Sequence, residues 1–229
     1  MSTPIITVII PAFNEEKSIG KVVSDIPRDL VEHVIVVNNN SNDNTVEVAK
    51  SAGAIVLDEP RRGYGWACLK GIEKSRELKT DIVVFMDGDY SDYPEEIVKV
   101  IAPILEDNHD MVIGSRVLGK REKGSLTPQQ VFGNRLATKL IRLFYGARFT
   151  DLGPFRAIKS DALEQLKMAD KTYGWTIEMQ IKASKEKMKF CEVPVNYRKR
   201  IGVSKVSGTI KGTVLAGIKI IFAIFKYRF

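Results

Sequence analysis

Short apolar runs alternate with helical segments along most of this chain, and this alternation most constrains the fold. The runs are rich in Val and Ile, as expected of strands buried on both faces of a parallel sheet. They cover 5–11 (IITVIIP), 33–38 (HVIVVN), 54–57 (AIVL), 81–87 (DIVVFMD) and 110–114 (DMVIG). Helices are predicted at 15–26, 44–52, 65–78 and 94–106. The sequence therefore predicts an α/β fold with a mostly parallel sheet and flanking helices.

Composition limits the classes of protein that fit. With 229 residues, 44% of them hydrophobic, the chain can bury the core of one domain or at most two. A net charge of +7 favours a polyanionic partner: nucleic acid, anionic lipid or a phosphorylated ligand. Aromatic residues are few and do not alternate with a basic stripe, which argues against nucleic acid. Cys68 and Cys191 form no CxxC pair, so a reducing compartment fits, and no signal peptide is predicted.

Polar residues collect where three of the predicted strands end. These segments are PAFNEE (11–16), NNNSNDNT (38–45) and DGDYSD (87–92). The carboxyl ends of parallel strands share one edge of a sheet, where ligands bind in open α/β folds. No Gly-x-Gly-x-x-Gly follows the first strand and no phosphate-loop motif occurs, which argues against the commonest dinucleotide and triphosphate sites.

Asp87 and Asp89 are the strongest candidates for metal ligands. Taken alone, the segment at 87–92 could be a turn, and the segment at 38–45 could be an Asx-rich turn that caps the next helix. Two carboxylates one residue apart after a buried strand can, however, reach the same hard cation. We therefore predict a site for Mg²⁺ or Mn²⁺, whose remaining ligands include phosphate oxygens.

Five segments in this order and approximate spacing resemble a known family. They are VIIPAFNEE, VVNNNSNDNT, DGDYSDYPEE, IGSR and RIGVSK. The chain resembles the family-2 glycosyltransferases with the GT-A fold over nearly its whole length. Within that family it is most similar to the polyprenyl-phosphate sugar transferases, the dolichyl-phosphate mannose or glucose synthases. The resemblance implies transfer of one sugar from a nucleotide donor to a lipid phosphate.

The resemblance also implies roles for individual residues on the donor side. Asn39 would lie near the base, although Asn38 and Asn39 stand where the family has two acids. Ser91 stands where mannose-transferring members often have Gln, so a third side-chain metal ligand does not follow, although Asp92 is close in sequence. The other residues implied for the nucleotide, diphosphate and metal are Pro11, Ala12, Asn14, Glu15, Arg62, Gly65, Asp87, Gly88 and Asp89.

A phosphate acceptor calls for cations more than for a base, because it is already ionised near neutral pH. The candidates at family-matching positions are Arg116, Arg135, Arg200 and Lys205. Asp151 matches a family acid and could hold a sugar hydroxyl, orient an arginine or cap a turn. In relatives an acid at the position of Glu178 faces the acceptor.

A soluble transferase acting on a saccharide hydroxyl is the alternative, and it would need Asp151 or Glu178 as base. A noncatalytic protein that binds anionic lipid is the alternative from another class.

Two amphipathic basic segments predict contact with a membrane surface. In 134–146, Leu136, Leu140 and Phe144 share one face, and Arg135, Lys139 and Arg142 lie on another. In 212–229, an apolar face lies beside Lys219 and Lys226, but the run is shorter than the roughly 20 residues that span a bilayer. The alternative is that these helices pack on the domain or form a homo-oligomer contact.

We therefore predict a peripheral enzyme at the cytoplasmic face of a membrane. Its GT-A domain would cover 1–210, with a nucleotide-sugar half (1–114) and an acceptor half (115–210), followed by a surface helix at 211–229. The neutral pair Asn38 and Asn39 and the similarity to glucosyl-type members favour UDP-glucose as donor. UDP-N-acetylglucosamine and GDP-mannose stay open.

Overall fold

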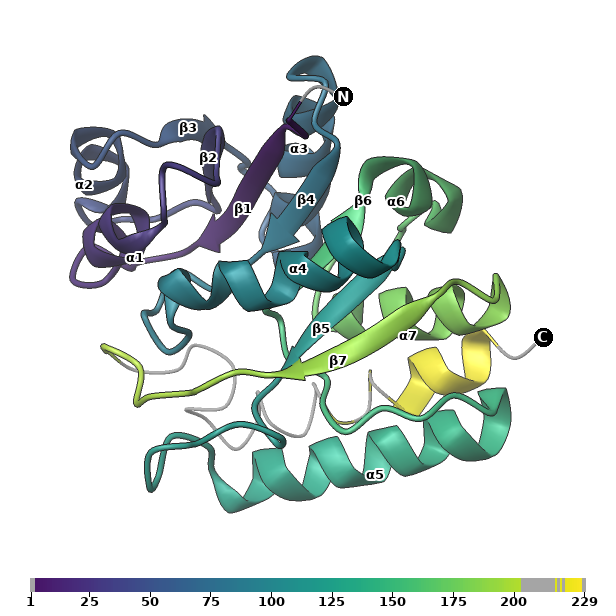
Figure 1. Cartoon of the computed structure of the whole chain (residues 1–229). Coiled ribbons are helices and arrows are strands. Elements are labelled where there is room, and N and C mark those ends of the chain that lie inside the picture. Colours follow the sequence, from purple (N-terminus) through teal and green to yellow (C-terminus); the bar gives the residue numbers. More distant parts are fainter. Residues whose placement is uncertain (1–2, 203–216, 218, 220, 228–229) are drawn as a thin grey trace.

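The computed structural model describes residues 3–202, 217, 219 and 221–227. One seven-stranded sheet lies at its centre, in the order β3-β2-β1-β4-β6-β5-β7, with helices on both faces (Figure 1). This confirms the predicted α/β fold with a mostly parallel sheet. The strands are β1 (Ile6–Ala12), β2 (His33–Asn38), β3 (Ile55–Asp58), β4 (Ile82–Phe85), β5 (Met111–Ser115), β6 (Arg156–Lys159) and β7 (Phe190–Pro194).

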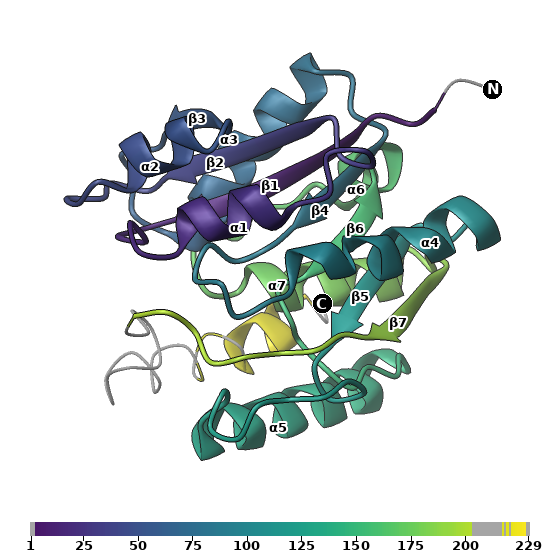
Figure 2. The ribbon, with the colours of Figure 1, turned by 60° about the vertical axis from the view of Figure 1, so that its left-hand side comes forward.

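Helices cover the two faces of the sheet in two groups, which Figure 2 shows from the side. Side chains alternate along β1, so that Ile9 packs against one group while Val8 and Ile10 pack against the other. This burial on both faces explains the continuous apolar runs of the sequence. The helices are α1 (Ile19–Asp25), α2 (Thr45–Ser51) and α4 (Ile97–Asp107) on one face, and α3 (Tyr64–Glu77), α5 (Pro128–Tyr145), α6 (Ser160–Leu166) and α7 (Trp175–Lys185) on the other.

The structure corrects two predicted boundaries next to the strand ends. The first helix begins at Ile19 rather than Glu15, because the Glu15 carbonyl accepts hydrogen bonds from the N–H groups of Ser18 and Ile19 in a turn. β4 ends at Phe85, so that Asp87 lies in the following loop. The helix predicted at 94–106 begins with a 3₁₀ turn (Pro94–Glu96) that leads into α4.

Among the described strands, β6 runs antiparallel to its neighbours. It fills the position between β4 and β5, with Ala157 opposite both Val84 and Val112. The sequence did not indicate it, because the four residues RAIK include a charged residue, Arg156, that is fully buried. β7 was also missed, since its residues are mostly half-buried and give no apolar run.

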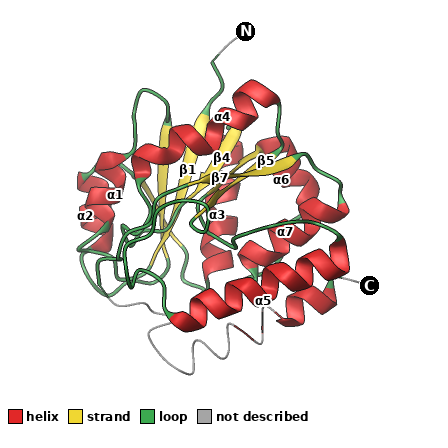
Figure 3. Ribbon diagram, turned by 60° about the horizontal axis from the view of Figure 1, so that its bottom comes forward, coloured by secondary structure: helices red, strands yellow, loops and turns green. Residues whose placement is uncertain are grey.

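Residues 221–226 are helical and pack beside α5 and α7 (Figure 3). Ala223 and Ile224 are buried in the same core as these two helices. The Phe225 ring lies 5.3 Å from the Phe144 ring, centroid to centroid. The chain end thus contacts the domain, as in the alternative left open above. The predicted division at residue 210 stays a prediction, because residues 203–216 lie outside the described part.

Candidate active site

The loops after β1, β2 and β4 surround one cavity of about 380 Å³. These strands are neighbours in the sheet, so their carboxyl ends lie at the same edge. Most of the residues predicted for the donor side line this cavity, together with Arg200 from the chain beyond β7. The lining residues are Pro11, Ala12, Phe13, Glu15, Asn39, Arg62, Gly63, Tyr64, Asp87, Gly88, Asp89, Tyr173 and Arg200.

Asp87 and Asp89 present their carboxylates to this cavity from the loop after β4. Asp89 Oδ1 accepts a hydrogen bond of 2.9 Å from the Ser91 N–H, which fixes the carboxylate. Asp89 Oδ2 lies 3.0 Å from a guanidinium nitrogen of Arg200. Burial, and next the charge of Asp89, raise the pKa of Asp87 to about 7. Two carboxylates thus lie close together at the cavity, and a bound cation would stabilise both in their charged form.

The oxygen atoms of this pair fit a hard divalent cation such as Mg²⁺ or Mn²⁺. Within residues 3–202 and the described part of the chain end, no three His, Cys, Asp or Glu side chains are arranged to hold a metal ion. Asp92 is fully buried outside the cavity, and burial raises its pKa well above the ordinary value. The site therefore fits an ion that takes two protein carboxylates and completes its shell with ligand oxygens.

Arg200 reaches the aspartates because residues 196–201 cross the loop after β4. The Arg198 and Ile201 N–H groups donate to the carbonyls of Ser91 and Asp89, each over 2.9 Å. The Arg198 guanidinium lies 3.4 Å from the centroid of the Tyr90 ring and donates to the Tyr90 carbonyl over 2.7 Å. We call residues 196–201 the strap.

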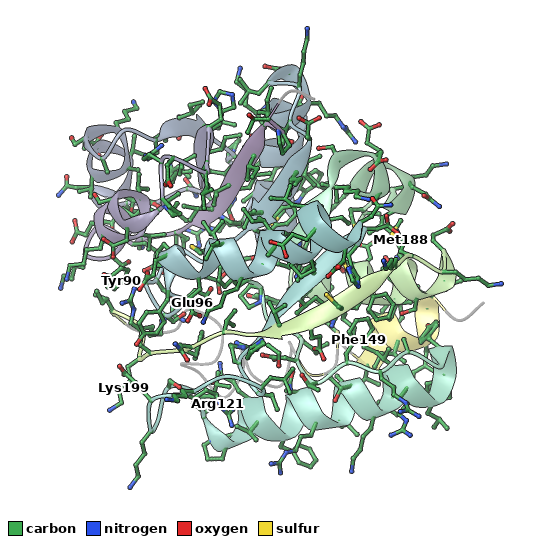
Figure 4. All side chains as sticks on the ribbon, in the orientation of Figure 1. Tyr90, Glu96, Arg121, Phe149, Met188 and Lys199 are labelled. Atoms are coloured by element: carbon green, nitrogen blue, oxygen red, sulfur yellow. The ribbon has the colours of Figure 1, made fainter. Side chains whose placement is uncertain are left out.

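The strap is anchored on both sides of the loop. Its Asn196 N–H donates to a Glu96 carboxylate oxygen over 2.7 Å, and its Lys199 N–H donates to a Glu122 carboxylate oxygen over 2.9 Å. In Figure 4, Tyr90, Lys199 and Arg121 lie at the same side of the molecule. The strap thus joins the loop after β4 to the segment after β5.

Asn39 lines the cavity, but its side-chain amide holds the opposite wall. Its Nδ2 donates to the carbonyls of Glu59 and Arg61 over 3.0 and 2.8 Å, and its Oδ1 accepts from the Gly63 N–H over 2.8 Å. Asn38 Nδ2 instead donates to a side-chain carboxylate oxygen, that of Asp58, over 2.8 Å across β2 and β3. The neutral amides therefore shape the loop that carries Arg62, which is a role the sequence did not indicate.

Asn14 and Gly65 were predicted for this site but do not line the cavity. Asn14 Oδ1 accepts from the Asn42 N–H over 2.8 Å, which ties the loop after β1 to the loop after β2. Gly65 lies against residue 170, and a Cβ at this position would stand 2.0 Å from the Asp170 carbonyl oxygen. Both residues shape the cavity from outside.

Arg116 and Asp151 form a buried pair outside the cavity lining. Arg116 Nε and Nη2 each donate to an Asp151 carboxylate oxygen over 2.7 Å. Burial raises the pKa of Asp151, but the guanidinium outweighs burial, so that the net pKa lies below its ordinary value. Asp151 thus binds an arginine through both carboxylate oxygens, which is the contact that the predicted role of orienting an arginine requires.

The remaining predicted residues are placed as follows. Arg135 is exposed on α5 and does not line the cavity, and Lys205 lies outside the described residues. Glu178 is a fully buried residue of α7 and does not line the cavity either. Phe13, Tyr64 and Tyr173 line the cavity and were missed, because aromatic residues beside a glycine or a strand look like core residues in a sequence.

The two amphipathic segments expose apolar side chains. Some of these are not the side chains that the sequence predicted for the apolar faces. On α5, Leu140 and Phe144 pack against the core, while Phe132 and Leu143 are 69% and 73% exposed. In the helical residues 221–226, which we call the last helix, Phe222 is 62% exposed. Arg135, Lys139 and Arg142 of α5 and Lys226 of the last helix are exposed as well. Within the described residues, no helix combines the length and apolar character needed to span a bilayer.

Comparisons with known proteins agree with this geometry. A UDP-N-acetylglucosamine–dolichyl-phosphate N-acetylglucosaminyltransferase of Methanococcus voltae is 31% identical over 216 residues, 85% of this chain and 86% of that protein. A dolichyl-phosphate hexose transferase of Haloferax volcanii is 29% identical over 216 residues, 92% of this chain and 90% of the relative.

Among solved structures, glucosyl-3-phosphoglycerate synthase from Mycobacterium tuberculosis, in complex with Mn²⁺, UDP and phosphoglyceric acid, matches with a TM-score of 0.79 at 22% identity. The match covers 98% of this chain and 78% of that one, and it shows the same GT-A fold. The model of the family described as "Glycosyl transferase family 2" matches residues 7–167. The chain therefore belongs to glycosyl transferase family 2.

Proposed function

We propose that the protein transfers one hexose from a nucleotide-sugar donor to a polyprenyl phosphate. The observation that carries this proposal is the cavity in which Asp87 and Asp89 meet Arg200. A divalent ion on the two carboxylates would stabilise the charge that develops on the leaving nucleoside diphosphate. Arg200 would hold phosphate oxygens of the acceptor, and the predicted roles of Arg135 and Lys205 as further cations for this phosphate are part of the proposal.

The burial and hydrogen bonding of Asp151 and Glu178 argue against transfer to a saccharide hydroxyl. That reaction needs a general base within reach of the hydroxyl. Asp151 is fully buried and bonded twice to Arg116, and Glu178 is fully buried with its carboxylate bonded to the backbone of residues 169 and 170. An acceptor phosphate, which arrives already ionised, does not require either of them.

Donor identity is the first part of the proposal to test. UDP-glucose is the favoured donor, and UDP-N-acetylglucosamine, the donor in the name of the M. voltae relative, is the first alternative. GDP-mannose is the third donor of the panel. Each is incubated with Mn²⁺ and a short, water-soluble polyprenyl phosphate, and the product is detected by mass. A glycolipid phosphate from one donor is expected, and transfer to a free saccharide alone would contradict the acceptor class.

We further propose that the exposed apolar and basic side chains of α5 and of the last helix attach the enzyme to a bilayer. Each buried methylene group or nearby basic residue contributes about 1 kcal/mol to such binding. Removal of all residues after Lys211 is expected to reduce binding to anionic liposomes and activity on long-chain acceptors. At a saturating concentration of donor, the short acceptor should remain a substrate. Liposome binding unchanged by the truncation and by high salt would contradict the membrane proposal.

The raised pKa of Asp87 predicts a pH dependence of stability in the metal-free protein. In the folded state this carboxyl keeps its proton up to about pH 7, whereas in the unfolded chain it loses the proton near the ordinary value of 3.8. Its contribution to stability therefore falls as the pH rises from about 4 to about 7. In urea titrations, Asp87→Asn, which cannot ionise, should become increasingly more stable than the unmodified protein over this range. A difference that is constant with pH would contradict the assignment.

A further inference from the structure

The turn between α6 and α7 forms part of the cavity wall. We call residues 167–174 the pocket loop. Tyr173 of this loop lines the cavity. On its other side, the carbonyl oxygens of Asp170 and Lys171 lie so close to Gly65 and Gly63 that Cβ atoms there would approach within 2.0 and 2.1 Å. The position of the pocket loop therefore determines the position of the backbone at Gly63 and Gly65, which adjoins the cavity.

Glu178 holds the pocket loop from beneath. The carboxylate is fully buried, and it accepts hydrogen bonds from the N–H groups of Ala169 and Asp170 over 3.0 and 2.7 Å. Lys182, one turn further along α7, forms an ion pair of 2.7 Å with the same carboxylate and donates to the Lys167 carbonyl over 2.7 Å. A buried carboxylate in such a network has one favourable position, so it fixes the backbone that it binds.

The end of the chain completes this network. The Tyr227 hydroxyl donates to Glu178 Oε1 over 2.7 Å, and Lys219 donates to the Thr172 hydroxyl of the pocket loop. Burial, and next the hydrogen bond to Glu178, raise the pKa of Tyr227, so its hydroxyl stays a proton donor at neutral pH. Two side chains on either side of the helical residues 221–226 thus bind the pocket loop or the carboxylate that holds it.

We propose that Glu178 and Tyr227 are positioning residues of the donor pocket. Through these two residues, docking of the last helix on α7 sets the affinity of the pocket for the donor nucleotide. This inference rests on the proposed function, which assigns the cavity to the donor. Neither residue touches the cavity: Glu178 acts through the backbone of Ala169 and Asp170, and Tyr227 acts through Glu178. A shift of the pocket loop would move Tyr173 and the backbone at Gly63, both of which line the cavity.

Hydrogen exchange of the full-length protein without ligand tests the connection. Tyr227→Phe removes one hydroxyl, and exchange in peptides that cover 63–66 and 167–174 should become about tenfold faster. The matched control is Tyr145→Phe, which removes the hydrogen bond from α5 to the Ile224 carbonyl of the same helix. The control should leave both peptides unchanged. Equal acceleration in both variants, or none in Tyr227→Phe, would overturn the proposal.

Nucleotide affinity tests the consequence for the donor. Binding of UDP and of GDP in the presence of Mn²⁺ is measured by calorimetry in the same variants and in Glu178→Gln. Tyr227→Phe is expected to weaken binding of the preferred nucleotide about five- to tenfold and to raise the donor KM, with the KM of a short acceptor unchanged. Unchanged nucleotide affinity together with faster exchange would overturn the positioning role. If the unmodified protein binds neither nucleotide, the donor assignment fails as well, and the exchange data alone decide whether Tyr227 holds the loop.

Discussion

Replacement of Asp89 by alanine is expected to lower sugar transfer by about 10³-fold or more. The change removes one of the two carboxylates that face the cavity and leaves the charge of Arg200 without its closest partner there. The fold should persist, because Asp89 lies in a loop rather than in a strand or helix. Initial rates with the preferred donor and a short polyprenyl phosphate measure the effect.

Two controls accompany this variant. Asp161→Ala removes an exposed carboxylate on α6 that does not line the cavity, and it should leave the rate unchanged. Excess EDTA should reproduce the loss in the unmodified enzyme, and added Mn²⁺ should reverse it. Full activity in Asp89→Ala or in excess EDTA would refute the metal site.

Asp151→Ala is expected to lower the free energy of unfolding by about 3–5 kcal/mol, since it leaves the Arg116 charge buried without a partner. The Arg116 side chain is only 13% exposed, and the Asp151 carboxylate is its bidentate partner. Asp151→Asn should cost less, because an amide oxygen can still accept one of the hydrogen bonds. Urea unfolding measures both variants.

A surface pair provides the control for this prediction. Glu77 is paired with Lys74 over 2.7 Å, but the two side chains are 60% and 32% exposed. Glu77→Ala should therefore change the free energy of unfolding little, because solvent screens an exposed ion pair. If Asp151→Ala cost no more than Glu77→Ala, the buried pair would not contribute to stability as its geometry indicates.

The donor side of the cavity could be predicted from the sequence because it is built from local signals. Each of Glu15, Asn39 and Asp87 follows an apolar run, and the parallel sheet brings the three run ends to one edge. The first helix was predicted too long because the polar residues from Glu15 onward suit either a helix or the turn that the structure contains.

The other side of the site depends on contacts between distant residues, which no local pattern encodes. Asp151 and Arg116 are each ordinary polar residues in the sequence, and only the fold pairs them. Tyr173 stands in a turn far from the strand ends, and only the packing of the pocket loop against Gly63 and Gly65 brings it to the cavity. The buried Arg156 concealed β6, because an arginine within four residues interrupts an apolar run.

The strap has a consequence for how the enzyme matures on the ribosome. Arg200 lies beside Glu15, a residue 185 positions earlier in the chain. Domains fold as they emerge, so β1 and β2 can pair long before the strap is synthesised, while contacts of such wide separation form slowly. A nascent chain would therefore carry Glu15 and Asp89 without their Arg200 partner until the strap has left the ribosome. Chains cut short before the strap would lack this cation in the cavity, even where β1 and β2 have already paired.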